Sequence, residues 1–352
     1  MHDLFTHPSF DDHEDVVFVS TAEAGLRGII AIHDTTLGPA AGGCRMRAYA
    51  SEEEALDDVL RLSRGMTMKN AAAGLPLGGG KCVVLADPAR ADKPALLRAM
   101  GAHVQRLGGN YWTAIDIGVS PADVDVMAES CEYVFTRPGD YEGDDAPARY
   151  TAYGGFQAVR AVAAHLRGAP ELSGLRVAVQ GAGQTGADLA RQLLAAGAEV
   201  AIADVDEAAA QAVAADGATV VSPDAIHAQD VDVFAPCALG GILNDRTIPE
   251  LRCRGIAGLA NNQLERPEHG RALMERRIAY APDFVANAGG IMRGAMPIFT
   301  KTDPARARRD VEGLYDKILA ILKRSEAEGV PTEEIAERAA KERIAAAKAK
   351  AA

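Results

Sequence analysis

The sequence predicts an α/β protein of two domains. Its 352 residues are more than twice the roughly 150 residues of an ordinary domain. Segments typical of strands alternate with segments typical of helices along most of the chain, as they do in α/β folds. In the second half, the fragment LRVAVQGAGQTGADLARQLL joins a β-rich run to an amphipathic helix through three glycines. These observations predict a Rossmann domain that follows a first α/β domain.

The first domain is expected to begin with two strands within residues 16–34, separated by a turn at a glycine. A helix then begins after Ser51, whose side chain can cap the third helical amide while Glu54 reaches back to the capping residue. Apolar residues recur at helical spacing from there toward Lys69. Three further elements follow in order: a strand at KCVVLAD, a helix near residues 92–107 and a strand at YWTAID.

The domain boundary is predicted at residues 136–150, which are rich in glycine, proline and aspartate and follow neither period. A second alternating unit runs from about 151 to about 290, and two helical segments, near 303–328 and 332–350, close the chain. The last segment has few large apolar residues, so it is expected to pack back on one of the domains and to fray at its end. The predicted domains are 1–140 with about 328–352, and 141–327.

The composition excludes several classes of protein. With a formal net charge of −12 and no basic stripe, the chain is not expected to bind nucleic acid. No run of apolar residues approaches the roughly 18 of a membrane span, and the amino terminus lacks the features of a signal peptide, so a cytoplasmic protein is expected. The five cysteines and eight histidines are scattered without metal-ligand spacing, so neither disulfides nor a bound metal ion is expected.

The glycine motif predicts a nucleotide site. Gly181 permits a tight turn, Gly183 lets the backbone approach a pyrophosphate, and Gly186 lets helix and strand pack closely. The following helix offers free amides and a partial positive charge to phosphates. A second strand ends at Asp204, where a carboxylate can bind the ribose hydroxyls and repel a 2′-phosphate, which favours NAD over NADP. The alternative, a glycine-rich turn in a sheet that binds no nucleotide, leaves this acid without a role.

Two lysines of the first domain raise a question of chemistry. A phosphate-binding P-loop needs glycine where this chain has Leu75 and serine or threonine where it has Cys82, so GLPLGGGKC is not one. Lys69 and Lys81 stand among small and apolar residues. Burial disfavours the charged form of a lysine, so one of the two is suited to act as a base. The other could then hold an anionic substrate. Asp116, at the end of a predicted strand, would complete an acid–base set. Alternatively, both lysines are exposed and the aspartate belongs to a turn.

Eight motifs, spread over nearly the whole chain, carry a family resemblance. They are GPAAGGCRM, GMTMKNAAAGLPLGGGK, TAIDIG, TAYG, QGAGQTG, APCALGG, ANNQL and APDFVANAGG. Their order resembles that of the amino-acid dehydrogenases of the glutamate, leucine, phenylalanine and valine family, and most of all the leucine, phenylalanine and tryptophan branch. The resemblance implies two domains around a cleft, an N-terminal α/β domain for substrate binding and oligomerisation and a Rossmann domain for the dinucleotide.

The resemblance also implies a reversible oxidative deamination, in which an L-amino acid, NAD⁺ and water give a 2-oxo acid, ammonium and NADH. Lys69 would hold the α-carboxylate, Lys81 would be the base that activates water, and Asp116 would exchange protons with the amino group. Gly42 and Asn262 would help to hold the substrate. The implied cofactor-binding residues are Gly181, Gly183, Gln184, Thr185, Gly186, Asp204, Thr151, Cys237, Ala238, Asn261 and Asn287.

The substrate side chain is implied by four positions. Glutamate-specific members of the family carry a lysine where this chain has Ala41, so an apolar side chain is expected. Small residues at Ala41 and Gly294, with Ala114 and Ile291 completing the wall, favour an aromatic substrate such as phenylalanine over leucine or valine. The preference is mild, since one methylene in such a pocket is worth about 1–3 kcal/mol.

The segment after NAGG departs from the family. It runs IMRGAMPIFTKTDPARARR where relatives carry a polar, acidic helix. Arg293 and Pro297 put the family's local helix, pocket wall and hinge in question, because a proline starts or breaks a helix. Two other functions stay open. One is an NAD-binding sensor without activity, which the presence of both lysines and the aspartate disfavours, and the other is an imine-reducing enzyme with an unusual 2-oxo acid. The family also implies a homo-oligomer formed through the first domain.

Overall fold

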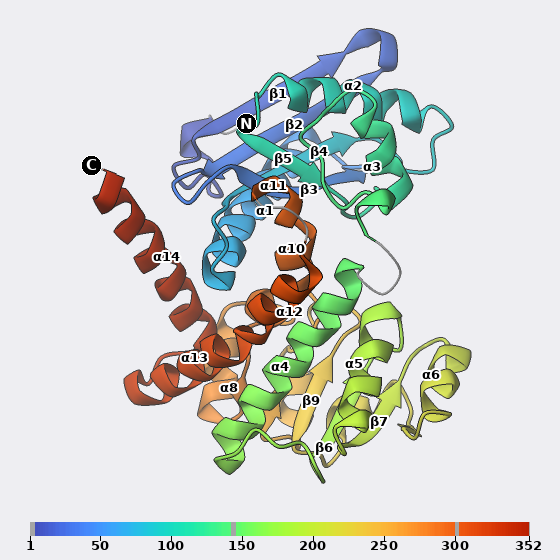
Figure 1. The fold of residues 1–352 in the computed structure, drawn as a ribbon, viewed down its shortest axis with the longest axis vertical. Coiled ribbons are helices and arrows are strands. Elements are labelled where there is room, and N and C mark those ends of the chain that lie inside the picture. Colours follow the sequence, from blue (N-terminus) through green and yellow to red (C-terminus); the bar gives the residue numbers. More distant parts are fainter. Residues whose placement is uncertain (1–3, 142–145, 300–302, 352) are drawn as a thin grey trace. The chain divides into compact units, whose positions relative to one another are not determined.

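The computed structural model describes residues 4–141, 146–299 and 303–351, and the chain divides into two compact units (Figure 1). Unit 1 contains Met1–Asp144, Gly294–Thr302 and Ala340–Ala352, and unit 2 contains Asp145–Arg293 and Asp303–Ala339. The chain leaves unit 1 a few residues after the predicted end of the first domain at 140. It joins unit 1 again for the short segment 294–302 and finally at Ala340, later than the predicted 328.

Unit 1 is built on a mixed five-stranded sheet. Its strands are β1 (Asp15–Thr21), β2 (Leu26–Asp34), β3 (Ala40–Arg47), β4 (Gly78–Leu85) and β5 (Tyr111–Ala114), in the order β1-β2-β4-β3-β5. β1 and β2 form the hairpin predicted within 16–34, with Gly25 in the left-handed conformation at its turn. β2 runs antiparallel to β4, whereas β3 runs parallel to β4 and β5. Small residues have low β propensity, so the fragment AAGGCRMR of β3 gives no strand signal in the sequence.

Helices cover both faces of this sheet (Figure 1). α1 (Glu52–Ala73) lies on one face, and α2 (Lys93–Gln105) and α3 (Pro121–Ala128) lie on the other. On the α1 side the core contains Ile29, Ala55, Val59, Leu60 and Val83. On the other side it contains, among others, Cys44, Met46, Cys82, Val84, Leu96, Met100 and Met127. Successive residues of β4 therefore alternate between two cores, as the period of a strand requires.

The start of α1 confirms half of the predicted capping box. The Ser51 hydroxyl accepts a hydrogen bond from the Glu54 N–H at 3.0 Å, as predicted. The Glu54 carboxylate accepts the N–H of Ala50 at 2.7 Å, one residue before the cap. The predicted reciprocal bond to the N–H of Ser51 is therefore replaced by a bond to its neighbour. Both bonds satisfy amides that have no partner within the helix.

The end of α1 is fastened to the sheet and to the carboxyl-terminal helix. Asn70 Nδ2 donates to the carbonyl of Gly78 at 2.6 Å, which ties the helix to the start of β4. On the other side the Arg343 guanidinium donates to the carbonyls of Ala71 at 2.9 Å and Gly74 at 3.0 Å. These carbonyls lie at a helix terminus, where the helix supplies no donor of its own.

Arg343 belongs to α14 (Thr332–Ala351), the helix predicted over 332–350. Its Ala340 and Ile344 are buried against residues of the last turns of α1. The expected packing is therefore confirmed, whereas the expected fraying is not seen, because the helix continues to Ala351.

Unit 2 is a Rossmann domain with a six-stranded parallel sheet. Its strands are β6 (Arg176–Gln180), β7 (Glu199–Ala203), β8 (Thr219–Val220), β9 (Val233–Pro236), β10 (Gly255–Ile256) and β11 (Ala279–Tyr280). They lie in the order β11-β10-β9-β6-β7-β8, with parallel pairing throughout. After β6 the chain adds β7 and β8 on one side of it, and then β9, β10 and β11 on the other side. In such sheets ligands bind where this reversal occurs, at the carboxyl ends of the strands.

The helices that lie wholly in unit 2 are α4 (Pro147–Arg167), α5 (Gln184–Ala195), α6 (Glu207–Ala214), α7 (Thr247–Glu250), α8 (Glu268–Glu275), α9 (Asp283–Ala286), α12 (Pro304–Glu312) and α13 (Leu314–Glu328). α4 begins inside the predicted boundary segment. The helical segment predicted near 303–328 divides at Gly313 into two helices. α10 (Gly289–Gly294) and α11 (Met296–Phe299) follow each other with one residue between them, and Pro297 stands in the first turn of α11, a position that proline tolerates.

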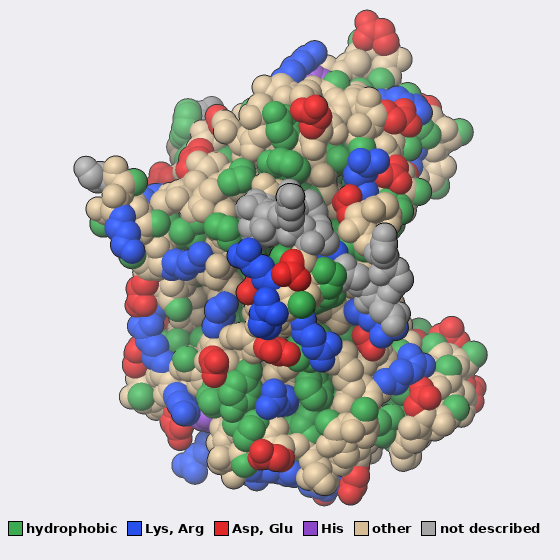
Figure 2. Space-filling model, viewed as in Figure 1, with side chains coloured by type: hydrophobic (Ala, Val, Ile, Leu, Met, Phe, Trp, Pro, Cys, Tyr) green, Lys and Arg blue, Asp and Glu red, His purple; other side chains and the backbone are tan. Residues whose placement is uncertain are grey.

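Figure 2 shows acidic and basic side chains interspersed over the viewed face rather than a broad basic area. Among the described residues, no helix combines the length and the apolar character that a membrane crossing requires. Nor do three or more histidine, cysteine or acidic side chains of that part of the chain gather in a way that could hold a metal ion.

Candidate active site

Lys81 and Asp116 form an ion pair in unit 1. Lys81 Nζ lies 2.5 Å from Asp116 Oδ2, and only 7% of the lysine side chain and 18% of the aspartate side chain are exposed. The lysine comes from β4, and the aspartate comes from the loop that follows β5. A charge withdrawn from water to this extent needs a partner, so each side chain accounts for the burial of the other.

The loop that carries Asp116 is held on the surface of β3. The carbonyl of Ile117 accepts a hydrogen bond from Met46 N–H at 2.9 Å. A Cβ atom added at Gly43 would lie 2.8 Å from Asp116 Cβ, and one added at Gly118, whose φ is +77°, would lie 2.1 Å from the carbonyl oxygen of Met46. Any side chain at either glycine would therefore push the loop, and the carboxylate with it, away from β3.

A second cation contacts the same carboxylate oxygen. Arg45 Nε donates to Asp116 Oδ2 at 3.1 Å, and Arg45 Nη1 donates to the two carboxylate oxygens of Asp58 at 3.2 and 3.0 Å. Tyr49 donates its hydroxyl proton to Asp58 at 2.8 Å. Burial by itself raises the pKa of Asp116, but the charges of Lys81 and Arg45 outweigh it and hold this pKa below its usual range.

The three glycines before Lys81 are surrounded by protein atoms. Gly78–Gly80 are the first residues of β4, not a loop. A Cβ added at Gly78 would lie 2.0 Å from the carbonyl of Asp34, one at Gly79 would lie 2.1 Å from the amide of Thr67, and one at Gly80 would lie 2.6 Å from the ring of Tyr111. The glycines therefore let β2, α1 and β5 close on β4 and leave no cradle for a phosphate.

The end of α1 brings Lys69 toward the same strands. Thr67, two residues before this lysine, packs on Gly79, two residues before Lys81. Asn70, the residue after it, bonds to the start of β4. Lys69 and Lys81 therefore both lie within two residues of the contact between the end of α1 and the start of β4.

The predicted substrate residues of unit 1 lie on the strands beside this region. Ala41 is fully buried on β3 and pairs with Gly79 of β4. Ala114 ends β5 and pairs with Gly43. The carbonyl of Gly42 accepts a hydrogen bond from the hydroxyl of Tyr111 at 3.0 Å. Unit 1 thus assembles Lys69, Lys81, Asp116, Ala41, Gly42 and Ala114 around β3, β4 and β5.

In unit 2 the glycine motif connects β6 to α5. Gly181 has a φ of +104°, and a Cβ added at Gly186 would lie 2.1 Å from its carbonyl oxygen, so both glycines are required by the turn. Gly183 precedes α5, and a Cβ added there would meet nothing within 4 Å. Gln184 and Thr185 are the first residues of that helix. The turn is therefore open at the point where free amides of the helix face outward.

Asp204 follows β7 and supports this turn. Its carboxylate accepts the N–H of Ala182 at 2.6 Å and the N–H of Asp206 at 2.8 Å. Each of these bonds goes to a different carboxylate oxygen, and each oxygen has a second lone pair. The acid thus has a structural role in the glycine turn, which the sequence did not indicate.

A further group of predicted residues lies after β9, β10 and β11. Asn287 Nδ2 donates to Asn261 Oδ1 at 2.8 Å, whereas Asn287 Oδ1 is buried with no hydrogen-bond partner among the described residues. Asn262 has a φ of +53°, and its carbonyl accepts the N–H of Gly241 at 2.8 Å. Cys237 and Ala238 follow β9 beside the glycine turn, where a Cβ added at Gly181 would lie 3.0 Å from the Ala238 amide. Burial raises the pKa of the Cys237 thiol to about 12.

Thr151 and α10 complete the predicted set. A Cβ added at Gly290 would lie 2.4 Å from the hydroxyl of Thr151, so α10 begins against the first turns of α4. Ile291 lies on α10 within unit 2, and Gly294, the last residue of this helix, is counted with unit 1. The predicted site residues therefore fall into two groups, one in each unit.

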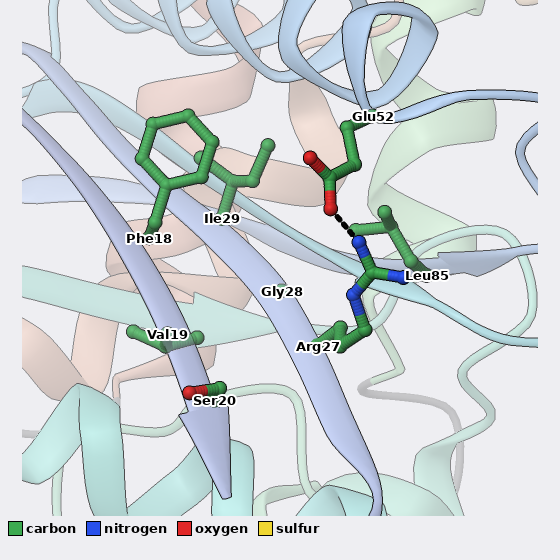
Figure 3. Close-up of a pocket in the computed structure, with 8 residues that line it drawn as sticks. All are labelled: Phe18, Val19, Ser20, Arg27, Gly28, Ile29, Glu52 and Leu85. Atoms are coloured by element: carbon green, nitrogen blue, oxygen red, sulfur yellow. Dashed lines mark ion pairs between the residues drawn. The ribbon is translucent and has the colours of Figure 1, made fainter.

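One cavity of unit 1 lies apart from these residues. It has a volume of about 160 Å³ and lies on the β1–β2 hairpin, where Arg27 and Glu52 form an ion pair and Phe18 is exposed (Figure 3). It contains none of the predicted site residues. The candidate site is therefore identified by its chemistry and not by this cavity.

Comparison with known proteins identifies the family. A family model described as "Glu/Leu/Phe/Val dehydrogenase, dimerisation domain" matches residues 13–133, and one described as "Glutamate/Leucine/Phenylalanine/Valine dehydrogenase" matches residues 203–350. A leucine dehydrogenase of Geobacillus stearothermophilus is 45% identical over 97% of this chain and 93% of its own length. A phenylalanine dehydrogenase of Bacillus thermotolerans is 40% identical over 98% of this chain and 92% of its own length.

The chain belongs to the Glu/Leu/Phe/Val dehydrogenase family. Among solved structures, the L-tryptophan dehydrogenase from Nostoc punctiforme matches with a TM-score of 0.86 and 42% identity over 96% of this chain and 97% of that one. The protein is thus an amino-acid dehydrogenase of the leucine, phenylalanine and valine branch, which confirms the resemblance carried by the eight motifs and the predicted two-domain α/β fold.

Dehydrogenases of this family use a nicotinamide dinucleotide, and unit 2 has features that fit one. The open approach at Gly183 and the uncapped start of α5 suit a pyrophosphate. The buried Oδ1 of Asn287 is an acceptor that an amide donor would satisfy. A bound dinucleotide would supply the hydride acceptor at this edge of the sheet.

Three side chains of this dehydrogenase were not indicated by sequence reasoning. Arg45 and Asp58 extend the Lys81–Asp116 pair, and Asn70 holds the lysine-bearing end of α1. Arg45 stands in the motif GPAAGGCRM, between residues that a strand would bury, and a half-buried arginine requires an acid. That signal predicts that a partner exists, but it does not say which acid it is.

Proposed function

We propose that this dehydrogenase catalyses the NAD-dependent, reversible oxidative deamination of an L-amino acid with a large apolar side chain, with a phenylalanine-like substrate favoured. The observation that carries the proposal is the Lys81–Asp116 pair, which is buried beside the lysine-bearing end of α1. Oxidation of an amino acid at its α-carbon requires a cation for the carboxylate and a base for the attacking water. Lys69 is assigned the first role and Lys81 the second.

The ion pair supports a proton relay between its two members. Asp116 is assigned the exchange of protons with the substrate amino group. Lys81, after it gives up its proton, takes one from the water that attacks the α-carbon of the iminium formed by hydride loss. A separation of 2.5 Å between Nζ and Oδ2 allows a proton to pass directly between these side chains. The dinucleotide, when bound, accepts the hydride.

NAD is proposed over NADP because of the charge beside the glycine turn. Asp204 follows β7 and is succeeded by Val205, Asp206 and Glu207, so the segment that would face the adenosine ribose carries three acids and no cation. A 2′-phosphate brought to this segment would be repelled, whereas ribose hydroxyls can donate to a carboxylate.

The substrate side chain is proposed from Ala41. This residue is fully buried on β3, next to the strand that carries Lys81, and its methyl group cannot pair with a side-chain carboxylate. A small side chain at this position is expected to leave room for a large apolar group of the substrate. The alternative is a preference for leucine or valine, and the 43–45% identity to leucine dehydrogenases supports it.

One experiment separates these possibilities. NADH consumption is followed with ammonium and the 2-oxo acids of phenylalanine, tryptophan, leucine, valine and glutamate, and again with NADPH. The highest kcat/KM is expected with the phenylalanine analogue and NADH. A preference for the glutamate analogue would contradict the proposal, and a preference for the valine analogue would replace the aromatic substrate by a branched-chain one.

A homo-oligomer in the cytoplasm completes the proposal. The family model over residues 13–133 is named for dimerisation, and β1 is an edge strand that exposes 59% of Phe18. The five cysteines are all free, as in proteins kept under reducing conditions. Light scattering on the purified protein should give a mass above that of one 36.9 kDa chain.

A further inference from the structure

Arg45 connects the proposed catalytic pair to the scaffold. It is a residue of β3 with 15% of its side chain exposed, and its guanidinium lies between two carboxylates. Nε contacts Asp116, and Nη1 contacts Asp58 of α1, which Tyr49 holds from the other side. The result is a row of alternating charges that begins at Lys81 and ends at Asp58.

We propose that Arg45 is a positioning residue of the reaction, which holds the Asp116 carboxylate against Lys81 and stabilises its ionised form while Lys81 is neutral. This inference rests on the proposed function, because it requires that Lys81 gives up a proton during turnover. It assigns no contact between Arg45 and the substrate.

The two cations beside Asp116 differ in whether they can lose a proton. Lys81 and Arg45 share one oxygen of Asp116, at 2.5 and 3.1 Å. A lysine can lose its proton in a reaction, whereas an arginine stays protonated in proteins. Whenever Lys81 is neutral, Arg45 still places a positive charge beside the carboxylate. Without it, Asp116 would be a buried carboxylate beside a neutral amine and would take up a proton.

The surroundings of Asp116 support this division of roles. Among the described residues, the charged or titratable groups that face it include Lys81 from β4, Arg45 and Cys44 from β3, and, through the arginine, Asp58 from α1. The thiol of Cys44 is buried and its pKa is raised well above the ordinary value, with its hydrogen bond to Cys82 and burial as the leading causes, so it is neutral. Arg45 therefore supplies the fixed positive charge of the group.

A purely structural role for Arg45, as a link between β3 and α1, predicts different behaviour. A link would affect stability and leave the titration of Asp116 and the chemical step unchanged. The matched control is Arg47, two residues further along the same strand, whose guanidinium pairs with Glu54 at 2.6 Å. Arg45→Met and Arg47→Met remove the same charge from the same strand.

The first measurement is independent of activity. The carboxyl of Asp116 is titrated by ¹³C NMR in the wild-type protein, Arg45→Met and Arg47→Met, with the signal assigned from Asp116→Asn. A carboxyl whose pKa is depressed is ionised above that pKa and loses its charge as the pH falls through it. We expect the protonation midpoint of Asp116 to move upward in Arg45→Met and to stay unchanged in Arg47→Met.

The second measurement is the pH profile of kcat. In Arg45→Met the acid limb should move to higher pH, and kcat at its optimum should fall at least tenfold with KM for the amino acid changed less than threefold. Arg45→Lys keeps a charge but cannot bridge Asp58 and Asp116, so it should restore the titration of Asp116 and only part of kcat. This variant also keeps the test open if Arg45→Met does not fold.

The outcomes separate the two proposals. The role of Arg45 would be overturned if Arg45→Met left both the titration of Asp116 and the pH profile of kcat unchanged. It would also be overturned if the protonation midpoint of Asp116 moved as far in Arg45→Lys, which keeps the charge, as in Arg45→Met. If the wild-type enzyme reduces none of the 2-oxo acids, the proposed function fails instead, and the NMR titration still decides whether Arg45 controls Asp116.

Discussion

At the scale of single residues, the central feature is a lysine and an aspartate that share a site from which water is largely excluded. Their burial is possible because each supplies the charge that the other needs, and because Gly43 leaves room for the aspartate above β3. The same packing keeps Nζ and Oδ2 within proton-transfer distance. The fold of unit 1 therefore holds the proposed proton acceptor and its partner together.

Replacing the proposed base tests its role directly. Lys81→Ala should lower kcat by about 10²- to 10⁴-fold, the usual contribution of a positioned acid or base. The dissociation constant of NADH should change less than twofold, because the proposed dinucleotide residues belong to unit 2. The control is Lys93→Ala, which breaks a similarly covered pair with Asp123 at 2.6 Å. Steady-state rates and fluorescence titration give both quantities, and a kcat within tenfold of wild type would disprove the assignment.

Asp204 offers a test of coenzyme choice. Asp204→Asn removes the charge and keeps an oxygen that can accept one of its two backbone bonds. The ratio of kcat/KM with NADPH to that with NADH should rise about tenfold, which corresponds to about 1.4 kcal/mol. Asp206→Asn is the comparison, since Asp206 is a neighbouring exposed acid that caps α6, and its loss should raise the ratio less than the loss of Asp204. Equal changes in both variants would indicate a general effect of charge and not contact with the ribose.

At the scale of elements, β4 and the end of α1 set the position of the lysines. The glycines of β4 allow the helix backbone to approach the strand, and Asn70 closes the contact with a hydrogen bond. A Cβ atom added at Gly79 would meet the backbone amide of Thr67, which cannot rotate away as a side chain can. A side chain added at this contact should therefore lower the free energy of unfolding.

Two alanine substitutions compare this contact with an open position. In Gly79→Ala the new Cβ would lie 2.1 Å from the amide of Thr67, so the free energy of unfolding should fall by about 3 kcal/mol. Gly65→Ala, on an exposed position of α1 with nothing within 4 Å, should raise it by about 0.5–1 kcal/mol. Urea denaturation measures both. A Gly79→Ala protein as stable as wild type would show that helix and strand can separate.

Arg343 gives a prediction for the carboxyl-terminal helix. Arg343→Met removes the donors to the carbonyls of Ala71 and Gly74, which should cost about 1 kcal/mol of stability. Because Lys69 lies in the last turns of α1, KM for the amino acid should rise while the affinity for NADH stays the same. Arg338→Met is the control, since Arg338 on the same helix pairs with the exposed acids Glu328 and Glu334. An unchanged KM would restrict Arg343 to a role in stability.

At the scale of the whole molecule, the proposed chemistry is divided between two units. Unit 1 carries the ion pair and the lysine-bearing helix, and unit 2 carries the glycine turn and the asparagines. Each group is assembled within its own unit by hydrogen bonds and close backbone contacts. The reaction requires that a substrate held by the first group meets a dinucleotide held by the second.

Hydrogen exchange tests this requirement. NADH alone should slow exchange in the fragment 180–187 of unit 2. NADH with a 2-oxo acid, in the absence of ammonium, should also slow exchange in the fragments 66–81 and 113–118 of unit 1, whereas the β1–β2 hairpin should not respond. Protection by the 2-oxo acid that is confined to unit 2 would contradict the assignment of substrate binding to unit 1.

The sequence by itself determined the class of fold and the type of most elements, and it proposed the residues of the site. These depend on periodicity and on spacings within a few residues, as in the cap at Ser51, the hairpin turn at Gly25 and the strand–glycine–helix signal that ends at Gly186. The helix predicted near 92–107 is α2, for the same reason. Local patterns of this kind survive folding because tertiary contacts reinforce them.

Only the tertiary structure decided which charges meet. Asp116 is separated from Arg45 by 71 residues and the carbonyl of Ala71 from Arg343 by 272, and no local pattern relates such positions. Three other features also depend on residues that are far apart in the sequence. They are the strand β3, the packing of Gly78–Gly80 and the support that Asp204 gives to the glycine turn. A buried charge or a missing Cβ shows in the sequence that a partner is needed, but the identity of that partner follows from the path of the whole chain.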